Sequence, residues 1–449
     1  MKLPIIHSFL NGEQRSVTVK KNIVASFVIK GISIVISLLL VPMTIGYVSA
    51  ELYGVWLAIS SVLTWISFLD LGFSQGLKNK LTEAIANNDW KRGKALVTTT
   101  YVMVSMIFVP LGIIMEFILP LIDWCKLLNV STIYAGEILM VMHVLIAFIC
   151  IQMIVNVLTV VVAAFQRVAF SSLFGVIGQI LSFIIIIILI KTTPPSLMGL
   201  AFSYSAMPVL VMIVASFILY SNRYKKVSPD LKTFDKGLIK ELFSLGYKFF
   251  IINLQVVVLY QSTNILISNV SSPLQVTSYN IAYKYLNVAM MAYTLITAPL
   301  WPAYTDAYVR NDFNWMKRTR NKMLKILFAS LIILVLMVLV SPIVYQFWIG
   351  DKATIPFLMT LLVGVYVGVF CWCSLNGTLA VGIGKIKLIT YFMVAGMLIH
   401  IPFSMMLSRY IGAYGVITSM ILITLVFAIV YEIQIEKIIS GKASGIWLQ

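Results

Sequence analysis

The chain has 449 residues, of which 60% are hydrophobic and only 11% are charged. Soluble globular proteins have about 45–50% apolar and about 25% charged residues, so this composition excludes a soluble protein and predicts an all-α polytopic membrane protein. The formal net charge of +17 is high enough for a nucleic-acid-binding protein. The positions of the basic residues, described below, indicate instead that the chain has no nucleic-acid partner.

Twelve segments are long and apolar enough to cross a bilayer, whose hydrocarbon core requires about 20 residues of helix. In the first half of the chain they are 22–47, 53–75, 95–118, 134–164, 168–190 and 197–220. In the second half they are 244–268, 277–303, 323–347, 355–379, 388–407 and 413–436. The sequence therefore predicts twelve transmembrane helices, six in each half.

The longest connection on the predicted inner side, residues 221–243, joins the two sets of six helices. Its apolar residues Phe234, Leu238 and Leu242 recur at helical spacing. This spacing predicts an amphipathic helix on the inner leaflet, with a plain solvated tether as the alternative. The predicted domains are an N-terminal lobe over 1–220, this cytoplasmic linker, and a C-terminal lobe over 244–449.

A short sequence repeat relates the two halves. Residues 82–90 read TEAIANNDW, and residues 305–313, which lie 223 positions later, read TDAYVRNDF. Each copy follows one long apolar segment and precedes another, so both copies have the same place within a half-chain. A repeat of this period indicates two structurally related lobes.

Lysine and arginine fall mainly on one side of the predicted spans. With the N-terminus inside, the cytoplasmic segments contain 26 of the 33 basic residues, and the outer loops contain only Lys126, Lys191, Lys352 and Arg409. This asymmetry is the positive-inside pattern, and it predicts that both termini and both copies of the repeat are cytoplasmic. The basic loops are then suited to anionic lipid headgroups, so membrane lipids are the predicted partner of this charge.

Several predicted spans carry polar side chains on one face. The second span offers Ser60, Thr64 and Ser67. The candidate substrate-binding residues are Lys30, Ser33 and Ser37 on the first span, Asn264 on the seventh, and Asn280, Lys284, Asn287 and the adjacent Tyr283 on the eighth. Polar faces are costly in lipid, so they are expected to line a central cavity or to form hydrogen bonds between helices. The cavity accounts better for the lysines, although both lie near enough to span ends for their ammonium groups to reach the headgroups.

Three carboxylates lie in or at the ends of predicted spans: Asp70, Glu116 and Glu137. Such groups bind Na⁺ or H⁺ in coupled transporters, or pair with a basic neighbour, and pairing is the favoured interpretation. His143 and His400 are candidate proton carriers, but a single histidine in a span is more often a hydrogen-bonded packing residue.

The sequence contains no recognisable motif for catalysis or for ATP-driven transport. It lacks a G-x-x-x-x-G-K-[ST] phosphate loop and an H-E-x-x-H zinc motif, and the predicted outer loops are too short for a catalytic domain. The four cysteines lie in or beside apolar segments and are expected to be packing residues rather than metal ligands. The sequence therefore predicts that the chain is not an enzyme and that it binds no metal or cofactor.

Short motifs occur in order along nearly the whole chain. They are Lys21-Asn-Ile-Val-Ala-Ser26, Val41-Pro42, Glu51-Leu-Tyr-Gly54, Leu69-Asp-Leu-Gly72, Leu245-Gly-Tyr-Lys-Phe-Phe250 and Tyr279-Asn-Ile-Ala-Tyr283. In these motifs the chain resembles the polysaccharide (oligosaccharide-lipid) flippases, of the O-antigen flippase type, of the multidrug/oligosaccharidyl-lipid/polysaccharide exporter superfamily.

The resemblance implies twelve helices in two pseudo-symmetric six-helix lobes around a central cationic cavity. It further implies transport of undecaprenyl-pyrophosphate-linked oligosaccharide units by alternating access across the bacterial cytoplasmic (inner) membrane. The product would be a surface polysaccharide such as O-antigen, capsule or exopolysaccharide. A polysaccharide polymerase in the same membrane is a candidate partner, and Na⁺ or H⁺ is a candidate coupling ion.

The predicted polar faces suit such a substrate. A glycan with a pyrophosphate cannot cross hydrocarbon unaided, and lysine attracts phosphate as a point charge that can also release it. A multidrug/cation antiporter of the same superfamily is an alternative, but its cavity is expected to be richer in acids. A peptidoglycan lipid II flippase is a third alternative, and its relatives often have extra helices that are not predicted here. A membrane glycan polymerase or ligase requires a larger outer loop.

Overall fold

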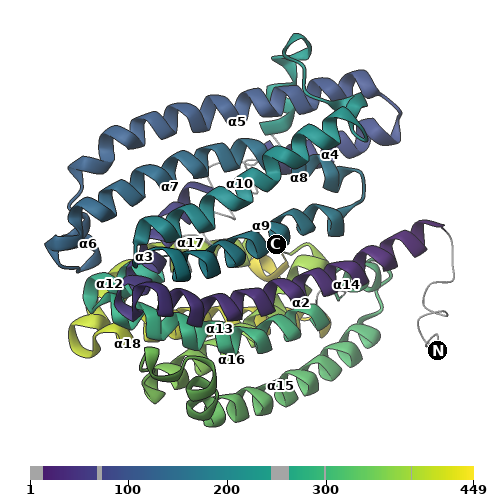
Figure 1. Cartoon of the computed structure of the whole chain (residues 1–449). Coiled ribbons are helices and arrows are strands. Elements are labelled where there is room, and N and C mark those ends of the chain that lie inside the picture. Colours follow the sequence, from purple (N-terminus) through teal and green to yellow (C-terminus); the bar gives the residue numbers. More distant parts are fainter. Residues whose placement is uncertain (1–13, 68–72, 244–261, 298–299, 386, 449) are drawn as a thin grey trace, which may run out of the picture. The chain divides into compact units, whose positions relative to one another are not determined.

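The computed structural model describes residues 14–67, 73–243, 262–297, 300–385 and 387–448. These residues form helices joined by short connections, and they contain no β-strand (Figure 1). In the first half the main helices are α2 (Gln14–Val48), α3 (Ala50–Ser67), α4 (Phe73–Ala86), α5 (Trp90–Ile118), α7 (Ala135–Val155), α8 (Val157–Ala164), α9 (Val168–Thr192) and α10 (Leu197–Ser221). In the second half they are α12 (Thr263–Val270), α13 (Pro273–Thr297), α14 (Leu300–Val309), α15 (Phe313–Trp348), α16 (Phe357–Ile383), α17 (Lys387–Ile411) and α18 (Ala413–Ile439). The predicted all-α class is confirmed.

Nine helical stretches in the described ranges are long and apolar enough to cross a membrane, and they match nine of the twelve predicted spans. Of the other three spans, α13 is a helix of 25 residues whose apolar character is reduced by Asn280, Lys284 and Asn287. Helix α3 covers only part of the second span, and the seventh span lies mostly outside the described residues. The chain is a multi-pass helical membrane protein.

Contacts divide the described chain into two compact units. Unit 1 takes its residues from Met1–Val48, Leu63–Trp124 and Ser131–Leu254, and unit 2 takes its residues from Ser49–Val62, Cys125–Val130 and Gln255–Gln449. The first part of α3 therefore packs with helices from the second half of the chain. The boundaries of two lobes and a linker, at 1–220, 221–243 and 244–449, stay a prediction.

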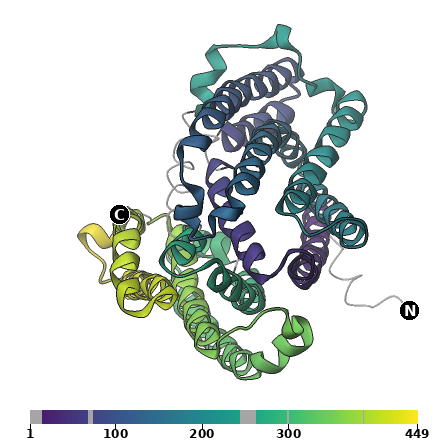
Figure 2. The same ribbon diagram turned by 60° about the vertical axis from the view of Figure 1, so that its left-hand side comes forward.

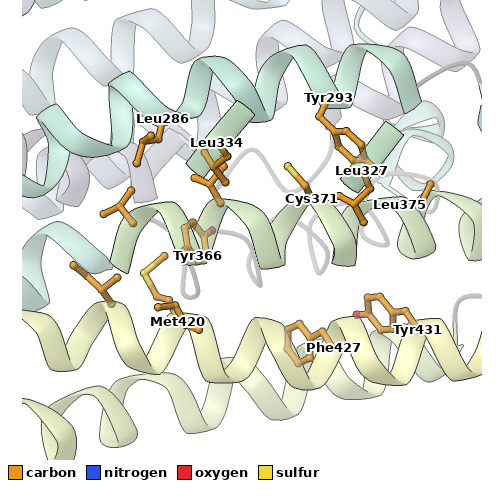
Figure 3. Packing of buried hydrophobic residues seen from close by; sticks show 14 of the residues in the cluster. Leu286, Tyr293, Leu327, Leu334, Tyr366, Cys371, Leu375, Met420, Phe427 and Tyr431 are labelled. Atoms are coloured by element: carbon orange, nitrogen blue, oxygen red, sulfur yellow. The ribbon is translucent and has the colours of Figure 1, made fainter. Parts of the chain in front are cut away.

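Each unit has its own arrangement of packed helices. In unit 1, α9 packs against α2 and α10, α7 packs against α5 and α10, and α4 packs against α5 and α8 (purple to teal in Figures 1 and 2). In unit 2, α16 packs against α13, α14, α15 and α18. Residues Tyr366, Cys371 and Leu375 of α16 lie in one buried cluster with Met420 and Phe427 of α18 (Figure 3). Helix α16 is therefore the centre of the core of unit 2.

The sequence repeat forms the same turn in both copies. Asn88 and Asn311 have left-handed backbone conformations, with φ of 56° and 58°, which asparagine tolerates better than most residues. Asp89 and Asp312 then cap the following helices, because their Oδ1 atoms accept a hydrogen bond from the backbone N–H three residues later, at 3.0 and 2.9 Å. The asparagine reverses the chain and the aspartate starts the next helix, so the two residues explain why this stretch recurs.

The helix before each turn is also anchored in an equivalent way. The hydroxyl of Thr82 donates to the backbone oxygen of Ala164 at 3.3 Å, and the hydroxyl of Thr305 donates to that of Gly382 at 2.7 Å. Ala164 is the last residue of the fourth predicted span of its half, and Gly382 lies three residues after the fourth predicted span of its half. The repeat therefore includes a tertiary contact as well as a local turn.

The connection between the halves packs against unit 1. Residues 237–243 are helical, and Leu242 is fully buried. A Cβ at Gly76 of α4 would lie 2.3 Å from the backbone oxygen of Leu242, so this contact requires glycine. The predicted amphipathic helix thus places at least one apolar residue against protein, whereas Leu231 before it is 80% exposed.

Salt bridges join the same connection to α4 and α5. Glu241 contacts Lys80 at 2.9 Å and Arg92 at 2.6 Å, and Asp230 contacts Lys94 at 3.0 Å. The hydrogen bond from Lys80 holds the pKa of Glu241 below its usual value, and the hydrogen bond from Lys94 lowers the pKa of Asp230 in the same way. Both carboxylates are therefore better stabilised as anions when the connection is docked.

Candidate substrate-binding site

Helices α3 and α13 cross closely in unit 2. A Cβ on Gly54 of α3 would lie 1.8 Å from the backbone oxygen of Pro273, at the start of α13. Beside this crossing, the hydroxyl of Thr277 donates to the backbone oxygen of Ala50 at 2.5 Å. Glycine permits this close approach because it has no side chain. The approach brings polar side chains of the two helices, and of the neighbouring α12, within hydrogen-bonding distance.

A set of five polar residues occupies this region, and we call it the polar cluster of unit 2. Asn264 of α12 donates to the hydroxyl of Ser61 at 2.7 Å, and Asn280 of α13 donates to Oδ1 of Asn264 at 2.8 Å. One turn further along α13, Nζ of Lys284 lies 3.3 Å from the hydroxyl of Tyr53. The structure thus brings together three of the predicted residues, from the seventh and eighth spans.

The polar cluster is partly enclosed. Tyr53 and Ser61 are 2% and 5% exposed, and Asn264, Asn280 and Lys284 are half-buried. The only charged side chain among the five is that of Lys284. Because a charge that is shielded from bulk water acts more strongly on a neighbouring charge, the cluster is suited to attract an anionic group. The amide and hydroxyl groups beside the ammonium can hydrogen-bond to the same ligand.

The two other predicted residues of α13 have different surroundings. Oδ1 of Asn287 is buried and has no hydrogen-bond partner in the described part of the chain. The ring of Tyr283 lies 5.8 Å from that of Tyr279 and 6.5 Å from that of Tyr366, and it packs against the apolar core. Asn287 therefore has a buried acceptor without a partner in the described chain, whereas Tyr283 is engaged in aromatic packing.

The predicted residues of the first span belong to unit 1. The hydroxyl of Ser33 donates to Gln179 of α9 at 2.7 Å, which is a hydrogen bond between helices. Ser37 is half-buried, and Lys30 is exposed. Ser33 thus takes part in helix packing, which was the alternative interpretation of the polar stripe, while Lys30 is accessible.

Two of the three candidate carboxylates, Glu116 and Glu137, lie in the described part of the chain, and both have partners. Glu116 of α5 contacts His143 of α7, and an oxygen of Glu137 accepts the backbone N–H of Leu197 at 2.8 Å at the start of α10. Asp70 lies outside the described residues. A role for these three residues in ion coupling stays a prediction. Within the described ranges, no group of three or more His, Cys, Asp or Glu is placed to hold a metal ion.

A second charged cluster of unit 2 was not predicted from the sequence. Arg320 of α15 contacts Glu432 of α18, and the same carboxylate accepts hydrogen bonds from Trp372 at 2.8 Å and from Asn376 at 2.6 Å, both on α16. Arg320 is only 9% exposed. The signal in the sequence was Glu432 itself, because an acid inside an otherwise apolar span requires a partner.

The fold and the membrane helices define the class of protein. A solved structure described as the inward-facing conformation of a multidrug resistance MATE family transporter of the MOP superfamily matches with a TM-score of 0.76 and 16% identity, over 91% of this chain and 95% of that one. The outward-facing conformation of a multidrug resistance MATE family transporter matches with a TM-score of 0.62 and 17% identity, over 98% of each chain. At such identities the similarity shows the fold alone, which is the fold of these membrane transporters.

The family follows from the sequence comparison. The model of the family described as "Polysaccharide biosynthesis protein" matches residues 19–308, which is more than half of the chain, and the chain belongs to this family. The chain is also 22% identical over 404 residues to a protein of Salmonella typhi named "Putative O-antigen transporter", covering 86% of this chain and 88% of that protein. The relative from Salmonella typhi and the structural neighbours are described as transporters, and this chain is a multi-pass membrane protein of the polysaccharide biosynthesis family.

Proposed function

We propose that the protein is a flippase that moves undecaprenyl-pyrophosphate-linked oligosaccharide units across the bacterial cytoplasmic membrane by alternating access, for the synthesis of a surface polysaccharide. The observation that carries this proposal is the polar cluster of unit 2, found in a chain of the polysaccharide biosynthesis family. Lys284 supplies a positive charge for the pyrophosphate, and the neighbouring amides and hydroxyls supply hydrogen bonds for the uncharged part of the head group.

The chemistry of the substrate explains why such a cluster is needed. Burying unpaired charges and many hydroxyl groups in hydrocarbon is prohibitive, so the head group must cross in a polar environment while the polyprenyl tail stays in lipid. A bidentate arginine binds phosphate in a fixed geometry, whereas lysine acts as a point charge. Lysine is therefore suited to a step in which the pyrophosphate is bound and then released.

A multidrug or cation antiporter is the second candidate function, because the similar solved structures are those of MATE family transporters. A site for cationic substrates is expected to contain carboxylates. The five residues of the polar cluster include none, and their single charge is the positive charge of Lys284. The cluster therefore favours an anionic substrate.

Deletion of the gene tests the proposal. The deletion strain is expected to retain lipid-linked glycan on the inner leaflet, to lose surface polysaccharide, and to keep its normal drug sensitivity. Normal surface polysaccharide together with loss of dye efflux would favour the antiporter instead.

The proposal includes an orientation in which both termini and both repeated turns are cytoplasmic. Its support is the excess of basic residues on that side. Na⁺ or H⁺ coupling and a polymerase partner in the same membrane belong to the same proposal. In a cysteine-free background, an impermeant thiol reagent added outside should not label a cysteine at Asn88 or Asn311. Labelling at either position would overturn the orientation.

A further inference from the structure

Unit 1 contains a polar cavity of about 280 Å³ that is separate from the residues discussed above. Its polar lining comes from Gln152, Asn156 and Thr159 on one side and from Ser171 and Ser172 of α9 on the other. None of the residues that line it carries a charge. It is therefore a neutral polar cavity within helices that are predicted to lie in the membrane.

The helical hydrogen bonding changes locally at this cavity, although Asn156 keeps right-handed helical angles, with φ of −64° and ψ of −17°. Asn156 separates α7 from α8, and its backbone oxygen accepts the backbone N–H of Thr159 at 2.9 Å and the hydroxyl of the same residue at 2.7 Å. Asn156 lies about 12 Å from the end of α8, at 1.5 Å per residue, so this local change is well inside the predicted span. A short turn with this i to i−3 hydrogen bond inside a longer helix often occurs at a functional site.

Two amide groups in the lining have unused hydrogen-bonding capacity. The side chains of Gln152 and Asn156 are half-buried, one turn apart on the same helical face, and neither amide forms a hydrogen bond with the described part of the chain. Neither amide is among the buried polar groups of the described chain that lack a partner, so both are accessible from the cavity. A ligand that both donates and accepts hydrogen bonds would satisfy both groups.

We propose that this cavity binds a sugar ring of the transported glycan. The inference rests on the proposed function and identifies a second part of the recognition site. Sugar hydroxyl and acetamido groups are uncharged donors and acceptors, as are the amides and hydroxyls of the lining. The rest of the wall, from Phe174, Pro208 and Met212, is apolar and suits the C–H faces of a pyranose.

Size and charge argue against other ligands. Pockets for small molecules typically have about 300–1,000 Å³, so a cavity of about 280 Å³ is suited to one ring rather than to an oligosaccharide. Oxygen-ligated cation sites usually include a carboxylate, and the lining contains none. An anion would lack a positive partner. A neutral polar group of the size of one sugar remains the best match.

The test uses purified protein in lipid nanodiscs and two probes: undecaprenyl pyrophosphate that carries one N-acetylhexosamine, and undecaprenyl pyrophosphate without sugar. The variants are Gln152→Leu, Asn156→Leu and their combination, since leucine is favourable in a membrane helix. Loss of two hydrogen bonds is expected to weaken binding of the sugar-bearing probe by about tenfold or more in the double variant. Binding of the sugar-free probe should be unchanged.

The controls separate the cavity from general effects. Asn222→Leu makes the same amide-to-leucine change outside the cavity, at the end of α10, and should leave both affinities unchanged. Asn156→Leu could act by disturbing the local turn at that residue. Gln152→Met keeps the length of the side chain and leaves Asn156 unchanged, so it should weaken sugar binding without such a disturbance. Equal losses for both probes, or unchanged binding of the sugar-bearing probe, would overturn the sugar site. Wild-type protein that binds neither probe would overturn the proposed function itself.

Discussion

In unit 2, the guanidinium of Arg320 and the carboxylate of Glu432 meet between α15 and α18, and the ammonium of Lys284 is half-buried on α13. In unit 1, Glu116 contacts His143. Ser33 and Gln179 join the first and fifth predicted spans by a neutral hydrogen bond, and the lining of the polar cavity is uncharged. Charge is costly inside a membrane protein unless it is paired or used. We therefore expect the charged residue Lys284 of unit 2 to contribute more to recognition of a charged substrate than the neutral polar cavity of unit 1 does.

The sequence repeat makes this comparison residue by residue. Arg320 follows the second turn at the same distance as Val97 follows the first, because the offset of the repeat is 223 residues. Val97 is fully buried, and Arg320 is 9% exposed. The same helix, started by the same aspartate cap, is thus anchored by an apolar side chain in one unit and by an ion pair in the other.

The largest expected effect comes from breaking this ion pair. Arg320→Leu leaves the carboxylate of Glu432 buried without its positive partner, although Trp372 and Asn376 still donate to it. Removing one partner of a buried pair typically costs about 3–5 kcal/mol. The free energy of unfolding in detergent, measured by denaturant titration, should fall by about 3 kcal/mol or more.

The double variant Arg320→Leu/Glu432→Leu removes both charges and should recover most of that loss, because apolar residues often replace a buried pair at little cost. Val97→Ala is the matched change in unit 1, and it should cost about 2 kcal/mol through the cavity that it creates. If the double variant is as unstable as Arg320→Leu, the unpaired charge of Glu432 does not explain the loss of stability, and the contrast in charge between Arg320 and Val97 has no energetic consequence.

The next effect concerns transport and the two lysines. Lys284→Ala should leave membrane insertion intact and lower the flipping rate per molecule by about tenfold to a hundredfold, since a hydrogen bond to a charged group contributes about 1.5–3 kcal/mol. Lys284→Arg should recover part of the rate, because the charge is kept while its geometry changes. Lys30→Ala should have a smaller effect, because Lys30 is exposed in unit 1. Flux of a fluorescent lipid-linked glycan in proteoliposomes, normalised to protein, measures all three variants.

Tyr53→Phe sharpens the same comparison. It keeps the ring and removes the hydroxyl that lies 3.3 Å from Nζ of Lys284, so it should lower the flux by a few-fold. Unchanged flux per molecule in Lys284→Ala would show that the polar cluster does not take part in transport. Equal losses of flux in Lys30→Ala and Lys284→Ala would show that the two units contribute equally to transport through their lysines.

Features that depend on neighbouring residues were predictable from the sequence. Long apolar runs gave the spans, and helical spacing placed Asn280 and Lys284 on one face of α13. The repeat identified a turn that the structure shows twice. In each case the physical cause lies within a few residues of the chain, as with the left-handed asparagine and the capping aspartate.

Features that depend on distant partners were not predictable. The partner of Arg320 is 112 residues away, and nothing in the local sequence selects Glu432. Ser60 is one of the polar residues predicted for the second span, but its hydroxyl donates to the backbone oxygen of Trp56 at 2.7 Å. The neighbouring Ser61 instead accepts the hydrogen bond from Asn264. One residue is about 100° of rotation on a helix, so a small error in phase changes which side chain meets the neighbouring helix.

The repeated turns should respond equally to the same change. Asp89→Ala and Asp312→Ala each remove a helix cap, and each should lower the free energy of unfolding by about 1 kcal/mol. Asparagine at the same positions keeps a capping oxygen and should cost much less. A loss in only one of the two alanine variants would show that the copies share a sequence but not an energetic role.

The smallest effect concerns the charges on the connection that packs on unit 1. Because a hydrogen bond from Lys80 lowers the pKa of Glu241, this stabilisation is present above the usual glutamate pKa of about 4.3 and is lost as the pH falls through the lower value in the folded protein. Solvent-accessible pairs contribute about 0.2–1 kcal/mol, so the connection should loosen without global unfolding between about pH 5 and pH 3. A spin label on Lys240→Cys, in a cysteine-free background, should become more mobile over this range. Glu241→Gln should make the label mobile already at pH 7 and weaken its pH dependence. If the label on otherwise unchanged protein does not respond to pH, the packing of the buried Leu242, rather than the salt bridges of Glu241, holds the connection on unit 1.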